Sequence, residues 1–125
     1  MMRRTRSIVI LTVVALAACA CGGSAPSTAS FVTRLDTLCN RGNAAYSAAS
    51  TSQAQTGVVA HYLDLFHSLT PPAHLRSLYS RYLSVLGQEL DALRQGHSGS
   101  VAHLAQTAAR PLASQLGARA CANPR

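Results

Sequence analysis

Apolar side chains recur every three or four residues along four successive segments of the chain, at residues 31–49, 53–68, 72–95 and 100–116. This spacing places them on one face of an α-helix. The third segment is the most regular, because its leucines and tyrosines keep the helical period over five turns. No segment has the alternating pattern of a strand bounded by turns. The pattern predicts an all-α fold, an up-down bundle of about four helices.

Polar and turn-forming residues separate the four segments and suggest how each helix starts. Thr28 or Ser30 can cap the first helix. The second can begin at Gln53 or only at Thr56. Thr70 can cap the third, which would carry the two following prolines in its first turn.

The fourth segment contains a proline and is rich in alanine. Pro111 should kink or split the helix near Ala109. The alanines on its apolar face would allow close packing against a neighbouring helix. Gly117 is expected to end the helix, since glycine readily adopts a left-handed conformation.

The first 19 residues follow a different pattern. Three arginines precede an uncharged apolar run at residues 8–18, as in a secretory signal. The run is too short to span a bilayer, which takes about 20 residues. It ends in Leu16-Ala17-Ala18-Cys19, which resembles the bacterial lipobox. That resemblance implies attachment of diacylglycerol to Cys19 and cleavage before it.

Cleavage at that point divides the chain into three parts. Residues 1–18 are the expected lipoprotein signal peptide and residues 19–29 a flexible tether of small and polar residues. Residues 30–125 form the helical bundle domain. The mature protein would then be held by its lipid at the extracytoplasmic face of the cell membrane.

Two other outcomes remain open at the N-terminus. An ordinary signal peptidase could cut after Ala17 or after Ala20 and release a secreted protein. Cys21 could carry the lipid instead, but Ala18 would then occupy a position where an aliphatic residue is preferred. Cys19 fits better.

The net charge of +7 overstates how basic the mature protein would be. Three of the 11 basic residues leave with the signal, so eight arginines face four acids, a net charge of +4. The arginines are scattered rather than clustered, and we expect no nucleic-acid partner. The expected partners are the membrane, through the lipid anchor, and an envelope protein or cell-wall polymer.

Three cysteines remain if Cys19 is lipidated, and an oxidising compartment favours a disulfide between two of them. Cys39 lies on the apolar face of the first helix, and Cys121 lies in the tail. Spacing alone leaves three pairings open. We expect Cys39–Cys121, which would tie the tail to the first helix and leave Cys21 unassigned.

The histidines and tyrosines are the candidate binding groups. His61, Asp64 and His67 share a polar flank of the second helix, but their directions spread over about 120°, too wide to converge on one metal ion. A solvated helix face is the simpler interpretation, and we expect no metal. Tyr79 and Tyr82 are expected to pack in the core; if they line a gap near the two prolines, they could hold an apolar ligand.

Enzyme signatures are missing from the sequence. It has no nucleophile elbow, zinc-protease motif or phosphate loop, and four acids leave little for paired-carboxylate chemistry. We therefore expect no catalytic residue, no cofactor and no enzyme activity. Glu89 lies at the margin of the third apolar stripe, either at the solvent boundary or paired with an arginine of another helix.

Three short motifs resemble small actinobacterial helical lipoproteins of unknown function. They are F-V-x-R-x-D-x-L-C-N-R-x-N-A at residues 31–44, L-T-P-P at residues 69–72 and L-G-x-x-A-C at residues 116–121. The resemblance implies a helical bundle with a Cys39–Cys121 bridge, and it implies no activity.

These features favour a non-enzymatic binding or structural module, anchored by lipid at the cell envelope. The alternative is a lipoprotein that binds a metal ion or a small ligand. A cavity of at least about 300 Å³ in the bundle would favour a small ligand.

Overall fold

The computed structural model describes residues 26–124 of the chain. The signal peptide at residues 1–18, Cys19 and Cys21 lie outside the described residues. The helices are α1 (Thr28–Ala48), α2 (Ser52–His67), α3 (Arg76–Arg94), α4 (Ser98–Leu104), α5 (Arg110–Leu116) and α6 (Arg119–Ala122). A 3₁₀ turn, Ala73–Leu75, precedes α3, and a π-helical segment, Ala105–Ala109, joins α4 to α5.

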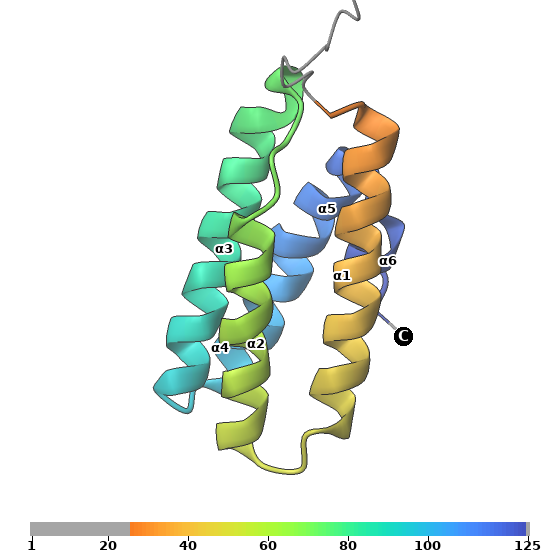
Figure 1. The fold of residues 1–125 in the computed structure, drawn as a ribbon. Coiled ribbons are helices and arrows are strands. Elements are labelled where there is room, and N and C mark those ends of the chain that lie inside the picture. The colour runs from red at the N-terminus through yellow and green to blue at the C-terminus, as the bar shows by residue number, and fades with distance from the viewer. Residues whose placement is uncertain (1–25, 125) are drawn as a thin grey trace, which may run out of the picture.

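The helices form an up-down bundle, which confirms the predicted fold class. In Figure 1, α1, α2 and α3 alternate in direction, and the α4–α5 segment returns along α3 behind them. The short α6 packs on α1 and closes the bundle. Residues 26–124 contain no strand, and none of their helices is both long and apolar enough to cross a membrane.

Two helices begin one residue after a side-chain cap. The Ser27 hydroxyl accepts a hydrogen bond from the Ser30 N–H at 3.1 Å, so the first cap is Ser27, and the predicted caps Thr28 and Ser30 are wrong. Thr51 caps α2 in the same way through the Ala54 N–H. The second helix therefore begins earlier than either predicted start.

The two prolines lie before the third helix rather than in its first turn. Pro72 is extended, with ψ of 152°, and the 3₁₀ turn begins only after it. Proline disfavours helical geometry in the residue before it, which explains why Pro71 does not start a helix. The predicted start at residue 72, with Thr70 as the cap, is therefore wrong.

Pro111 splits the fourth segment as predicted. Proline has no backbone N–H, so Pro111 cannot donate the α-helical hydrogen bond to the carbonyl four residues earlier. The five residues before Arg110, Ala105–Ala109, adopt the wider π-helical turn. Gly117, with φ of 80°, ends α5 as expected. The Ala118 N–H donates to the Ala113 carbonyl at 3.0 Å, the long hydrogen bond of a Schellman motif.

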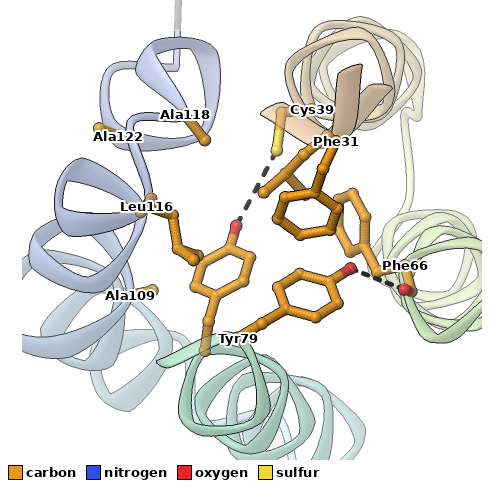
Figure 2. Close-up of a cluster of buried hydrophobic side chains, with 11 residues drawn as sticks. Phe31, Cys39, Phe66, Tyr79, Ala109, Leu116, Ala118 and Ala122 are labelled. Atoms are coloured by element: carbon orange, nitrogen blue, oxygen red, sulfur yellow. Dashed lines mark hydrogen bonds between the residues drawn. The ribbon is translucent and has the colours of Figure 1, made fainter. Parts of the chain in front are cut away.

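Aromatic side chains fill the half of the bundle near the start of α1. The rings of Phe31 and Tyr79 meet edge to face at 4.9 Å, and Leu35 and Leu116 are buried beside them. Figure 2 shows the Tyr79 hydroxyl directed at the Phe66 carbonyl, to which it donates a hydrogen bond of 2.6 Å.

The expected disulfide between Cys39 and Cys121 is present, with Cα atoms 5.2 Å apart. It joins α1 to the C-terminal tail, which forms the short helix α6. Two polar contacts lie beside it. Asp36 accepts a hydrogen bond from the Ala120 N–H at 3.0 Å, and the Asn43 amide donates to the Ala120 carbonyl at 3.4 Å.

Candidate functional site

A cavity of about 380 Å³ lies inside the bundle, in the half nearer the α1–α2 and α3–α4 turns. It is partly enclosed by the helices and partly open to solvent. Its floor is the inner edge of the aromatic core, where Phe66, Tyr82 and Cys39 lie. The wall residues are Gly42, Asn43, Tyr46 and Ser47 of α1; Val58, Val59, Tyr62 and Leu63 of α2; Leu86, Glu89 and Leu93 of α3; and Val101, Ala105, Ala109, Arg110, Cys121 and Pro124.

Small side chains explain why this half of the bundle is hollow. Val101, Ala105 and Ala109 face the cavity where the opposite half has large residues such as Leu116. The π-helical segment carries two of these alanines. The sequence predicted that the alanines of the segment at residues 100–116 pack closely against a neighbouring helix. The fully buried Ala113 does so. At Ala105 the alanine borders empty space instead.

Gly42 shapes the opposite wall. A Cβ atom at this position would lie 3.2 Å from the Tyr62 ring, closer than ordinary van der Waals contact. The missing side chain therefore lets Tyr62 of α2 lie directly against the α1 backbone. This close approach positions one of three tyrosine rings that line the cavity; the others belong to Tyr46 and Tyr82.

Among the described residues, Glu89 is the one carboxylic acid in the cavity wall. Its Oε1 atom is buried, and within residues 26–124 it has no hydrogen-bond partner. Buried polar atoms in proteins nearly always have a partner, since leaving one unmatched costs about 1–3 kcal/mol. Burial raises the pKa of the Glu89 carboxyl to about 7, and the positive charge of Arg110 partly opposes that rise.

Glu89 is half-buried, as expected for a residue at the solvent boundary, although its Oε1 atom is itself buried. The alternative prediction, an ion pair with an arginine of another helix, is not met among residues 26–124. Among the described residues the one ion pair is Arg94–Asp91, on the exposed surface of α3. Arg110 of α5 contributes a positive field at the cavity wall, while its own side chain is exposed.

The hydroxyl groups of Tyr79 and Tyr82, in the aromatic core, are buried and directed at atoms of the protein. Tyr82 directs its hydroxyl at the Cys39 Sγ atom, 3.9 Å away, and must be the donor because a disulfide sulfur carries no hydrogen. Burial strongly raises the pKa of Tyr82 and of Tyr79. Neither phenol is therefore suited to act as a base.

The remaining predicted site residues are not brought together. His61, Asp64 and His67 are exposed on α2, and no group of three potential ligands able to hold a metal ion occurs within residues 26–124. Tyr79 and Tyr82 do not share a gap near the prolines. Tyr82 forms part of the cavity floor, whereas Tyr79 borders a separate hollow of about 530 Å³ beside Pro71. That hollow is more open to solvent.

Comparison of the chain with protein-family models, with curated proteins and with solved structures finds no match.

Proposed function

We propose that this protein is an exported, lipid-anchored binding module that holds a small, largely apolar molecule in the cavity of its helical bundle. The observation that carries the proposal is the 380 Å³ cavity, whose wall is formed mainly by apolar and aromatic side chains. Ligand sites in proteins have this character and a volume of about 300–1,000 Å³. The proposed role is non-enzymatic.

The volume limits the size of the ligand. An apolar cavity of about 150 Å³ accommodates benzene, with its six carbon atoms. On that scale, a cavity of 380 Å³ accommodates a ligand of roughly 15 non-hydrogen atoms. The ligand would be the size of one aromatic ring with a short chain, rather than a peptide or polymer.

Binding can be tested with phenylbutanol, an 11-atom probe with an aromatic ring and a terminal hydroxyl. Calorimetric titration of the purified protein should show saturable binding, and the NMR signals of Val59 and Ala105 should shift with it. Ala105→Phe, which fills the cavity, should weaken binding at least tenfold. Ala102→Phe adds the same ring to an exposed position of α4 outside the wall and should leave binding unchanged.

A second filling variant protects this test against a failure to fold. Val101→Phe enters the cavity from α4 and should reduce binding as Ala105→Phe does, and thermal unfolding identifies any variant that is not folded. Saturable binding that survives in a folded filling variant would contradict the proposal, as would absence of binding in the parent protein.

The anchoring part of the proposal rests on the sequence alone, through the apolar run and the Leu-Ala-Ala-Cys motif ending at Cys19. Mass spectrometry of protein extracted from membranes should show a chain that begins at Cys19 and carries a diacylglycerol mass there. Cys19→Ala should release the protein from the membrane fraction. A mature chain that begins at any other residue would refute the anchor.

A further inference from the structure

The Glu89 carboxyl in the cavity wall lacks a hydrogen-bond partner for its Oε1 atom among the described residues. Every other polar side chain of the wall is neutral or, like Arg110, exposed to solvent. Within residues 26–124, the Glu89 Oε1 atom is the buried side-chain polar atom that has no hydrogen-bond partner. A bound molecule that donates a hydrogen bond would complete it.

Aromatic rings accompany the carboxyl. Tyr46 of α1, Tyr62 of α2 and Tyr82 of α3 line the cavity from three sides, and Phe66 lies at its floor. The faces of aromatic rings attract cations, and clusters of such rings are a recurrent way to bind ammonium groups in proteins. A carboxylate with several aromatic rings is a set of groups suited to a protonated amine.

We propose that the cavity selects a small apolar amine, whose ammonium group binds the Glu89 carboxylate while its apolar body fills the space among the tyrosine and valine side chains. This proposal rests on the proposed function, and it adds the class of ligand. Arg110 also lines the cavity, and its positive charge acts on the Glu89 carboxyl. It therefore opposes a cation there, and an anionic ligand would instead pair with Arg110.

The proposal implies that binding depends on pH. The pKa of the Glu89 carboxyl is about 7 in the empty cavity, so about half of the molecules must lose a proton at neutral pH before an ammonium group can pair there. Among residues 26–124, the charged and titratable groups that line the cavity with Glu89 are Arg110 of α5 and the phenols of Tyr46, Tyr62 and Tyr82. Burial raises the pKa of the Tyr82 phenol, so this group stays neutral between pH 5 and pH 8.

Three probes with one phenylbutyl body and different head groups test the ligand class: phenylbutylamine, phenylbutanol and phenylbutyrate. At pH 8 the amine should bind the purified protein at least tenfold more tightly than the alcohol. Its affinity should fall about tenfold per pH unit below pH 7, while that of the alcohol should not. Glu89→Gln should abolish both the preference and the pH dependence and keep binding of the alcohol. Asp91→Asn, an equal charge change on the exposed face of α3, should alter neither.

The outcomes separate this inference from the function on which it rests. If none of the three probes binds, both fail. If all three bind with similar affinity, or if Glu89→Gln leaves the amine affinity unchanged, the cavity is a ligand site but the assignment to amines is wrong. Tightest binding of phenylbutyrate, lost in Arg110→Gln, would likewise overturn it in favour of an anionic ligand.

Discussion

The Asp36 carboxylate accepts a hydrogen bond from the Ala120 N–H, 84 residues later in the chain. Ala120 is the second residue of α6, so this carboxylate caps the last helix from the side of the first. Asp36→Ala should lower the free energy of unfolding by about 1–2 kcal/mol, as loss of a helix cap does. Chemical denaturation measures the loss, and faster hydrogen exchange at the Ala120 amide would locate it.

Asp64→Ala is the matched control, because Asp64 is exposed on α2. It should change the stability by less than about 0.5 kcal/mol. Equal losses in the two variants would show that the Asp36 contact does not stabilise α6.

The Cys39–Cys121 disulfide closes most of the bundle domain into one loop, since its two cysteines are 82 positions apart in the sequence. Cys39→Ser or Cys121→Ser should cost about 2–5 kcal/mol, because the unfolded chain regains the freedom that the crosslink removes. The double variant should lose no more than either single variant. Cys21→Ser should leave the denaturation midpoint unchanged, and an equal effect of all three single substitutions would contradict the pairing.

Tyr79 and Tyr82 differ in what their hydroxyl groups bind. Tyr79→Phe removes a buried 2.6 Å hydrogen bond to the Phe66 carbonyl and should cost about 1–2 kcal/mol. Tyr82→Phe removes only a 3.9 Å contact with a disulfide sulfur, and its cost should be smaller. Thermal unfolding of the two variants side by side checks this order, which a larger loss for Tyr82→Phe would reverse.

The buried Glu89 carboxyl should make the protein less stable as the pH rises. Its pKa is raised from 4.5 to about 7 by folding, so the folded state keeps a proton that the unfolded state has already lost in this range. The contribution of Glu89 to the free energy of unfolding is therefore complete below about pH 4.5. It falls by roughly 2–3 kcal/mol as the pH rises to 7.

Glu89→Gln should remove this part of the pH profile and exceed the parent protein in stability at pH 8. Urea denaturation at several pH values measures the difference between the two proteins, which cancels the contribution of the histidines. Asp91→Asn should follow the parent profile. A constant difference between Glu89→Gln and the parent across pH 4–8 would contradict the buried ionisation.

Helical periodicity predicted the bundle because its apolar stripes are long and regular. The third helix shows both the strength and the limit of that argument. Its stripe was recognised at Leu78, Tyr82 and Leu86, yet its start was placed at Pro72 rather than Arg76. Prolines are common in the first turn of a helix. However, a proline disfavours helical geometry in the residue before it, and the helix therefore begins only after both prolines.

The cavity could not be predicted in the same way, because it depends on which side chains meet across helices. Gly42 and Ala105 each looked like an ordinary small residue on an apolar face. Only the fold places both in the wall of one space. The one signal of the cavity in the sequence was the position of Glu89 at the edge of the apolar stripe. How far its carboxyl is buried depends on the small residues of the facing helices, which the sequence pattern does not reveal.

The length of α1 separates the cavity from the N-terminal start of the bundle. α1 begins at Thr28, whereas the cavity lies beside Gly42, Tyr46 and Ser47. At 1.5 Å per residue, Tyr46 is about 27 Å along the helix axis from Thr28. If the proposed lipid on Cys19 anchors the protein, the aromatic core is the half nearer the point of attachment along the chain, and the cavity is the farther half, so that a ligand can reach it without first entering the bilayer.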